Sequence, residues 1–433
     1  MLQQPLIQSV NGQEILDSRG NPTILATVTL RDGTVAQAAS PSGASTGIYE
    51  AHERRDGEAF RYDGRGVRFA VADIQTMISP ALSGRRVDDQ RAVDQLLCQL
   101  DGTPNKDSLG ANTILAVSLA CARAAASYYH LPLYRYLGGT CANRLPVPMM
   151  NVLNGGAHAS NNVEIQEFMI VPVGAETFAE GLRIGSEIYH SLGKYLKTKG
   201  YSCTVGDEGG YAPNLASDEE ALDLLCHAIT DAGYTTDTVR LALDAAASEW
   251  ATSEGSETSN PDLPPDIYHR RKRRETFTPE ELIHYWERLS SRYPLLSLED
   301  GLDQRDFAHW ELLTRQIGEK LLLVGDDLFV TNPRRLQEGI RRHAGNSILI
   351  KPNQIGTLSE TLDVIRQARQ AGFRYIISHR SGETADTTIA DLAVATGAPY
   401  IKSGAPCRSE RLAKYNRLLQ IEKELDGKSV YGV

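Results

Sequence analysis

The second half of the chain repeats one pattern, a short apolar strand that ends in a polar residue and is followed by an amphipathic helical segment. Five of these strand ends, at positions 299, 326, 351, 379 and 402, are 27, 25, 28 and 23 residues apart. This spacing accommodates one strand, one helix and two turns. The pattern predicts a parallel βα series, with strands at 241–244, 295–299, 321–326, 348–351, 375–379 and 400–402.

We expect the series to close into a (β/α)8 barrel, because no Gly-rich dinucleotide-binding sequence opens it and enough strands are present to close the sheet. At 433 residues the chain also exceeds one ordinary domain. Gly138-Gly139 ends a different pattern that precedes the series. The predicted fold class is α/β, with an α+β N-terminal domain at 1–139 and a barrel domain at 140–433.

The expected N-terminal domain begins with strands and continues with helices. A β-branched strand at 23–30 ends at the turn signal Asp32-Gly33, and a second strand at 36–39 could return antiparallel to it. The segment 110–129 is rich in Ala, Leu and Val and has few charges, which is typical of a helix buried on most of its faces.

The charge balance favours a small-molecule substrate. The net charge is −10, whereas neutralising nucleic-acid phosphates or anionic lipid needs a large basic surface. The first residues have neither a basic segment nor a long apolar one, and no later run reaches the length of a membrane span. Six widely spaced cysteines indicate neither a disulfide framework nor a zinc site. We expect a cytoplasmic protein that requires no nucleic acid and has no membrane span.

Between Ala251 and Thr276 the composition shifts to Ser, Thr, Pro and Glu, and then to the basic run Arg270-Arg271-Lys272-Arg273-Arg274. The shift predicts a surface excursion. The run could be a localisation or polyanion-binding patch, but in so acidic a chain we favour a solvated loop.

Three acids end strands of the predicted barrel: Asp244, Glu299 and Asp326. The C-terminal ends of barrel strands share one rim, so these carboxylates should meet there and leave positions on a hard cation open for water and substrate. Each acid could instead cap the next helix. Three acids on successive strands make that reading less favourable, and they predict a magnesium site.

Lys351 and Lys402 also follow buried strands and need a partner or a chemical role. Nearby divalent cations and another ammonium disfavour the charged form of a lysine. The neutral amine is then available to act as a general base near neutral pH. Such a site suits proton abstraction beside a carboxylate, with metal stabilising the ene-diolate.

Other polar segments point to a phosphorylated substrate. His379-Arg380-Ser381 offers a guanidinium fork and a hydroxyl to a phosphate. Glu167 and Glu208 lie in QEFMIVP and in the Gly-flanked turn VGDEGG, from which a side chain can reach the centre. The loop 42–47 lacks the ending of a nucleotide-binding loop and is better interpreted as a mobile lid.

Eight segments in one order, covering nearly the whole chain, resemble the enolase family. They are ILDSRGNPT at 15–23, PSGASTG at 41–47, NVLNGGAHASNN at 151–162, VGDEGG at 205–210, LSLED at 296–300, VGDDLFVTNP at 324–333, ILIKPNQIGT at 348–357 and SHRSGET at 378–384. A lysine base beside magnesium is a known feature of enolase-superfamily sites. The resemblance implies a lyase of glycolysis and gluconeogenesis that reversibly dehydrates 2-phosphoglycerate to phosphoenolpyruvate through an enolate stabilised by two magnesium ions.

The resemblance also implies a role for each rim residue. Lys351 would remove the C2 proton, and Glu208 would assist departure of the C3 hydroxyl with support from Glu167 and His158. The remaining implied roles are binding of one magnesium ion by Asp244, Glu299 and Asp326 and of the second by Ser45 and the substrate phosphate, phosphate binding by Arg380 and Ser381, lining of the substrate pocket by His379, His158, Glu167 and Lys351, and contact of Lys402 with the substrate carboxylate.

The chain departs from the family pattern away from this site. Charged residues that commonly pair across a dimer interface are replaced by Leu25 and Gln420, and a usual basic residue by Gln13, although its expected partner Glu187 is present. We expect a homodimer or higher homo-oligomer with weaker, more apolar or rearranged contacts.

Two other functions remain open from the sequence. The chain could be a different enolase-superfamily enzyme that acts on an unphosphorylated acid, although SHRSGET and the Ser45 loop argue against it. It could also be a non-catalytic binding or structural protein that retains the fold. Such a protein would be free to lose Lys351, Glu208 or a metal ligand, and all are kept.

Overall fold

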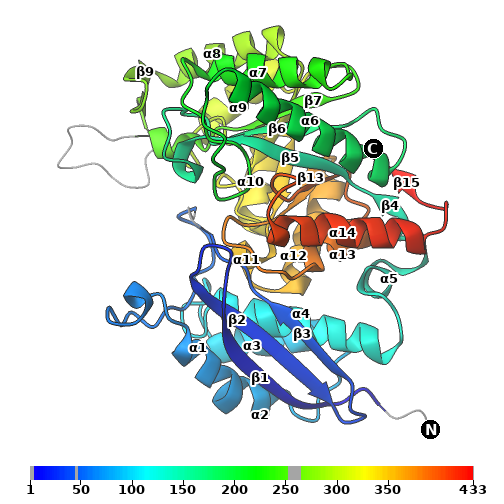
Figure 1. Cartoon of the computed structure of the whole chain (residues 1–433). Coiled ribbons are helices and arrows are strands. Elements are labelled where there is room, and N and C mark those ends of the chain that lie inside the picture. The colour runs from blue at the N-terminus through cyan, green and yellow to red at the C-terminus, as the bar shows by residue number, and fades with distance from the viewer. Residues whose placement is uncertain (1–3, 44–46, 252–264, 433) are drawn as a thin grey trace.

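A computed structural model describes residues 4–43, 47–251 and 265–432. The chain forms a smaller N-terminal domain beside a barrel domain (Figure 1). The N-terminal domain opens with an antiparallel sheet of three strands in the order β1-β2-β3. Its strands are β1 (Ile7–Leu16), β2 (Pro22–Leu30) and β3 (Val35–Ala39). The antiparallel return of β3 on β2 was predicted, and β1 was not.

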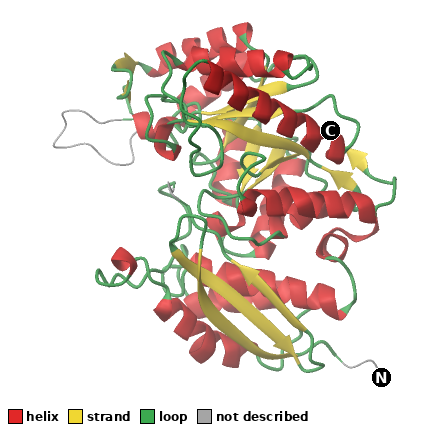
Figure 2. Ribbon diagram, in the orientation of Figure 1, coloured by secondary structure: helices red, strands yellow, loops and turns green. Residues whose placement is uncertain are grey.

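Helices cover one face of this sheet (Figure 2). The longest, α4 (Ala111–Tyr128), packs on β2 and β3 and is buried on nearly all sides, as its uncharged sequence predicts. Alanines along α4 keep its surface low, so that the sheet and α3 can both approach it. The other elements are η1 (Tyr62–Gly64), α1 (Arg68–Asp73), η2 (Ile74–Ile78), α2 (Ser79–Leu82), α3 (Gln90–Asp101), α5 (Leu133–Gly138) and η3 (Gly139–Cys141).

Eight strands of the second domain close into a barrel in the order β10-β11-β12-β13-β14-β5-β6-β7. They are β5 (Val147–Asn154), β6 (Glu167–Val171), β7 (Arg240–Asp244), β10 (Leu295–Glu299), β11 (Leu322–Gly325), β12 (Ser347–Ile350), β13 (Arg374–Ser378) and β14 (Tyr400–Lys402). Helices surround this sheet (Figure 2). The helices of this domain are α6 (Phe178–Thr198), α7 (Asp218–Asp231), α8 (Pro279–Arg292), α9 (Phe307–Ile317), α10 (Pro333–Arg342), α11 (Pro352–Ile355), α12 (Leu358–Gln370), α13 (Thr388–Thr396) and α14 (Ser409–Glu424). The predicted barrel is thus present.

The expectation of a wholly parallel series is wrong at β6, which runs antiparallel to β5 and to β7. Residues 155–166 join β5 to β6 through a 3-10 turn, η4 (Gly156–His158), rather than through a helix. Without a crossover helix the chain can only fold back antiparallel. Glu167, the first residue of β6, therefore lies opposite Asp244, the last residue of β7, on the same rim.

Apolar side chains fill the interior of the barrel away from that rim. They include Met149, Met169, Val324, Leu349 and Ile376, all buried. Polar residues follow these positions at the strand ends, so the apolar layer forms a floor beneath them. Within the described ranges no helix is both long and apolar enough to cross a membrane.

The prediction of a solvated basic loop holds only in part for the residues that the structure describes, because Arg271, Lys272 and Arg274 are exposed but Arg270 is buried. Residues 252–264 lie outside the description, but β8 (Tyr268–Arg270) and β9 (Glu275–Phe277) form an antiparallel hairpin. Arg270 is 3% exposed and pairs with Asp218 at the start of α7. Its guanidinium also lies 5.4 Å from the ring centre of Trp250. The run is therefore partly a structural element, because one of its charges is neutralised inside the fold.

Small strands and turns complete the barrel domain. β4 (Arg144–Leu145) pairs in parallel with β15 (Val430–Tyr431), which brings the end of the chain beside the entry to the barrel. A 3-10 turn, η5 (Ala247–Trp250), follows β7. The acidic rim is surrounded by the loops after the strands and by residues 41–43 and 47–51 of the N-terminal domain.

Candidate active site

A pocket opens at the rim of the barrel where most of the predicted site residues meet. Those that line it are His158, Glu167, Glu208, Asp244, Asp326, Lys351, His379, Arg380, Ser381 and Lys402. Glu299 joins the same cluster through its contact with Lys402. Ser45 lies outside the described residues. Distant segments converge because the strand ends share one rim, and because β6 begins there.

Lys402 is the centre of the acidic cluster and is 2% exposed. Its Nζ donates to Glu299 Oε1 at 2.8 Å and to Asp244 Oδ2 at 3.2 Å, and it lies 3.1 Å from Glu167 Oε2. Burial acts to lower the pKa of Lys402, but Glu167, Glu299 and Asp244 outweigh it and hold that pKa well above its usual value. The lysine is therefore a fixed cation.

One ammonium cannot neutralise three buried carboxylates. Burial and the neighbouring Asp244 raise the pKa of Glu299 well above its usual value, which means that its ionised form lacks compensation. Oxygen ligands with an excess of negative charge are the environment that a hard divalent cation prefers. The chemistry of this cluster fits a metal ion held by Asp244, Glu299 and Asp326.

Lys351 Nζ donates to Asp326 Oδ2, and the other oxygen of Asp326 accepts from Gln354 Nε2 at 2.8 Å. Burial, Arg380 and Lys402 act to lower the pKa of Lys351, but Asp326 and Glu299 outweigh them and the pKa is raised. The neutral amine expected from the sequence is thus not the form favoured in this arrangement. Its formation requires that Asp326 be engaged elsewhere.

Two further acids, Asp300 and Asp327, were missed by the sequence reasoning. Asp300 accepts from the backbone N–H of Asp326 at 3.0 Å and of Asp327 at 2.8 Å, so it fixes the turn that carries both. Oxygens of these three acids lie within 4.8 Å of one another. Burial raises the pKa values of both Asp300 and Asp327 well above normal, with further contributions from the charges of Asp327 and Asp326 for Asp300, and of Asp326 and Glu50 for Asp327. The sequence signal for them was that each directly follows a predicted strand-end acid, Asp300 after Glu299 and Asp327 after Asp326.

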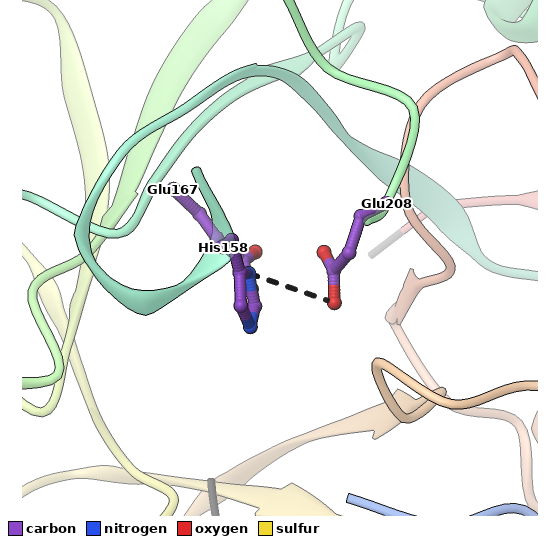
Figure 3. Close-up of side chains that lie close together, drawn as sticks. All are labelled: His158, Glu167 and Glu208. Carbon is purple, nitrogen blue, oxygen red and sulfur yellow. Dashed lines mark ion pairs between the residues drawn. The ribbon is translucent and has the colours of Figure 1, made fainter. Parts of the chain in front are cut away.

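Glu167, His158 and Glu208 form a second buried group (Figure 3). His158 Nδ1 lies 3.6 Å from Glu167 Oε1 and 3.9 Å from Glu208 Oε1. These distances are too long for hydrogen bonds but short enough for strong electrostatic coupling. Asn151 Nδ2 donates to Glu208 Oε2 at 2.9 Å and holds that carboxylate in place.

The surroundings shift the pKa values of Glu167 and Glu208 in opposite directions. Burial and the charge of Glu208 raise the pKa of Glu167 well above its usual value. Burial would also raise the pKa of Glu208, but His379, His158 and Arg411 outweigh it and the pKa lies well below normal. Pairs of carboxyl groups separated in this way commonly divide the acid and base roles. The directions of these pKa shifts favour Glu167 over Glu208 as the carrier of a proton in this group.

Arg411, on α14, was also missed and fixes the tautomer of His379. Arg411 is fully buried, and its Nη1 lies 2.6 Å from His379 Nδ1. Since a guanidinium only donates, Nδ1 accepts and the ring proton is on Nε2, which lies 3.3 Å from Glu208 Oε1. Burial lowers the pKa of His379 to about 4, so the ring is neutral at physiological pH.

The predicted phosphate-binding residues, Arg380 and Ser381, are buried in the lining of the pocket, and Arg380 contacts Glu50 of the N-terminal domain. Arg380 Nη1 lies 2.8 Å from Glu50 Oε2 and 3.2 Å from Asn353 Oδ1. Ser42 and Gly382 exchange backbone hydrogen bonds, which ties the start of the predicted lid to the barrel. A side chain at Gly47 would lie 3.0 Å from Asp327 Oδ1, so the far end of the lid passes directly over the acids.

Comparison with known protein families gives two matches. Residues 7–137 match the model for the enolase N-terminal domain, and residues 142–433 match the model for the enolase C-terminal TIM barrel domain. Together the two matches cover nearly the whole chain.

Proposed function

The chain belongs to the enolase family, and we propose that it is a phosphopyruvate hydratase, which interconverts 2-phosphoglycerate with phosphoenolpyruvate and water. The observation that carries the proposal is the presence of two separate proton-handling groups in one pocket. Lys351 pairs with Asp326, whereas His158 lies between Glu167 and Glu208. A β-elimination needs one group to take a proton and another to assist the leaving hydroxyl.

Magnesium fits the acidic cluster, and members of this family typically bind it. Asp244, Glu299 and Asp326 are its proposed ligands, since they carry more negative charge than Lys402 neutralises. When bound, the ion would neutralise the charge that develops on the substrate carboxylate. For a second ion we propose Ser45 and the substrate phosphate as ligands.

Lys351 is the proposed base. Burial, Arg380 and Lys402 all lower its pKa, and the carboxylates of Asp326 and Glu299 raise it. Engagement of Asp326 elsewhere would therefore release Lys351 as a neutral amine. Its Nζ would take the proton from C2 of 2-phosphoglycerate, and the electron pair of the broken C–H bond would pass into the adjacent carboxylate to give the enolate.

The second group would complete the elimination. As the C3–O bond breaks, the leaving hydroxide takes a proton and departs as water. The resemblance of VGDEGG to the family pattern implies Glu208 as the residue that assists this proton transfer. The raised pKa of Glu167 and the lowered pKa of Glu208 favour Glu167 as the residue that stores the proton, with His158 between the two.

Substrate binding would rearrange existing ion pairs. The space between the pocket side chains is about 30 Å³, enough for a water molecule but not for a phosphorylated three-carbon acid. The phosphate would compete with Glu50 for Arg380, and Ser381 would add a hydroxyl. Lys402 would turn toward the substrate carboxylate as magnesium takes over its carboxylate partners.

A direct assay tests the proposal. Purified protein is mixed with 2-phosphoglycerate, and the ultraviolet absorbance of the enol product is followed with and without magnesium. We expect magnesium-dependent growth of absorbance, and none with glycerate, which lacks the phosphate. Turnover of unphosphorylated acids alone would favour another enolase-superfamily reaction, and no turnover of any acid would favour a non-catalytic role.

A further inference from the structure

The ammonium of Lys272, at the turn between β8 and β9, reaches across to the loop that joins β5 to β6. Its Nζ donates to the backbone carbonyls of Gly156 at 2.8 Å, Val163 at 3.2 Å and Ala159 at 3.3 Å. Gly156 lies two residues before His158, and Ala159 directly follows it. One cation therefore holds the backbone on both sides of this histidine.

The base of the hairpin is anchored independently of Lys272. The backbone N–H of Arg273 donates to Glu164 Oε1 at 2.9 Å, and the N–H of Glu164 donates to Asp218 Oδ1 at 3.2 Å. Asp218 in turn pairs with the buried Arg270. This second set of contacts holds the end of the loop near β6, whereas Lys272 holds its middle.

Other hydrogen bonds also hold this loop: the N–H of His158 donates to the carbonyl of Gly155 at 3.0 Å, and that of Gly156 to the carbonyl of Val163 at 3.0 Å. Gly156 has φ of +51°, a region that side chains disfavour, so the backbone beside His158 has more conformational freedom than other residues would give it. Three carbonyl oxygens that converge on one point also repel one another unless a cation lies between them. A positive charge between them therefore stabilises the conformation that places His158 between Glu167 and Glu208.

We propose that Lys272 is a positioning residue for His158, an inference that rests on the proposed function. The ammonium holds the three carbonyls together and so fixes the distance of the imidazole from the two glutamates. Lys272 is an exposed residue, so its removal leaves no cavity in the core. Its ammonium nevertheless contacts three carbonyls of the loop, so we expect its removal to act on the geometry of that loop.

The first test replaces the charge and then restores it. We expect Lys272→Met to lower kcat by about tenfold, the scale of losing a charged hydrogen-bond donor, with a smaller change in KM. In Lys272→Ala, small alkylammonium ions should restore part of the lost activity, because they can re-enter the exposed carbonyl site. Arg271→Ala is the matched control, since Arg271 is an exposed neighbour in the same run, and it should keep wild-type activity.

The second test asks whether Lys272 acts through His158. In a His158→Ala background, adding Lys272→Met should cost nothing further, because the residue it positions is already absent. Full, independent losses in the double variant would overturn the proposal, as would an unchanged kcat in Lys272→Met.

A readout without substrate separates this inference from the proposed function. Amide hydrogens of residues 155–163 should exchange faster in Lys272→Met than in the wild type, while those of the barrel strands should not change. If the wild type lacks hydratase activity but the exchange difference is present, the proposed function is refuted and the positioning role of Lys272 stands. If the wild type is active and the exchange does not differ, only the positioning role of Lys272 is refuted.

Discussion

Lys402 Nζ lies 2.8 Å from Glu299 Oε1 and 2.9 Å from Glu299 Oε2, so the ammonium contacts both oxygens of one carboxylate deep in the barrel rim. Both residues are 2% exposed. This pair shows that part of the charge of the acidic cluster is neutralised by a lysine that the proposed reaction needs elsewhere. The same carboxylates are then available to exchange one cation for another.

Removal of that ammonium should make the fold depend on metal. We expect Lys402→Met to reduce the free energy of unfolding by about 3 to 5 kcal/mol in chelator, because it leaves buried carboxylates without a partner. Thermal unfolding with and without magnesium measures this. Magnesium should raise the Tm of the variant more than that of the wild type, and equal shifts would contradict the exchange of cations.

Loss of Asp326 should affect both metal binding and Lys351 more than loss of any other acid of the site. Asp326→Asn removes a proposed metal ligand and the partner of Lys351. We expect the magnesium concentration for half-maximal activity to rise by about tenfold or more. Asp237→Asn, whose side chain is 92% exposed, is the control. Full activity of the wild type after exhaustive chelation would sink the metal hypothesis.

The barrel and most of its rim could be predicted because strand ends carry a local signal. A buried apolar strand followed by Asp, Glu or Lys is visible in the sequence, and closure of the barrel brings such residues together. The reversed direction of β6 could not be predicted so easily, because strand direction depends on whether residues 155–166 form a helix. Their glycines and asparagines were the signal against one.

Arg411, unlike the missed acids Asp300 and Asp327, acts from outside the strand ends. Arg411 and Lys414 lie on the same face of α14 as Tyr415, Leu418 and Ile421, and all five are buried. Charged residues within an apolar stripe were the available signal that this face of α14 has a polar role. The signal did not reveal that role, because the partners of these residues lie far away in the sequence. The contacts of Lys272 likewise depend on tertiary structure, and composition alone favoured a solvated loop.

The neutral state of His379 should make stability depend on pH. Its folded pKa is about 4, against an ordinary value of 6.5, so the unfolded chain binds the proton more readily. Stability therefore falls as pH drops below 6.5 toward 4, by an amount on the order of 3 kcal/mol. Denaturant unfolding of wild type and His379→Gln at several pH values isolates this contribution, since other acids cancel in the difference. Parallel pH profiles would show that His379 is not held neutral.

The oligomer should be insensitive to salt. Leu25 is only partly buried and Gln420 is exposed, while Glu187 bonds within its own chain to Arg183 at 3.0 Å and to Tyr234. Leu25 and Gln420 carry no charge and Glu187 is already paired within its own chain, so these positions cannot form an ionic interface. We expect a dimer held by apolar and uncharged contacts. Light scattering across a salt series checks this, and steep dissociation as salt rises would contradict it.

Lys351 and the Glu167–His158–Glu208 group should fail in different ways, because proton abstraction and hydroxide loss are separate events in the proposed reaction. With Glu208→Gln, Lys351 and the acidic cluster remain. The C2 hydrogen of 2-phosphoglycerate should then still exchange with deuterated solvent, while phosphoenolpyruvate formation falls by about two or more orders of magnitude, the scale of losing a general acid. With Lys351→Ala, both exchange and product formation should be lost.

Glu167→Gln extends this comparison to the residue that stores the proton. If the raised pKa of Glu167 reflects that role, this variant should also keep C2 exchange and lose product formation at least as severely as Glu208→Gln. NMR of 2-phosphoglycerate in heavy water follows exchange in all three variants. Rapid exchange by Lys351→Ala would show that the base is assigned wrongly. Near-normal product formation by Glu167→Gln would return the acid role to Glu208 alone, because an amide cannot deliver the proton that the leaving hydroxide needs.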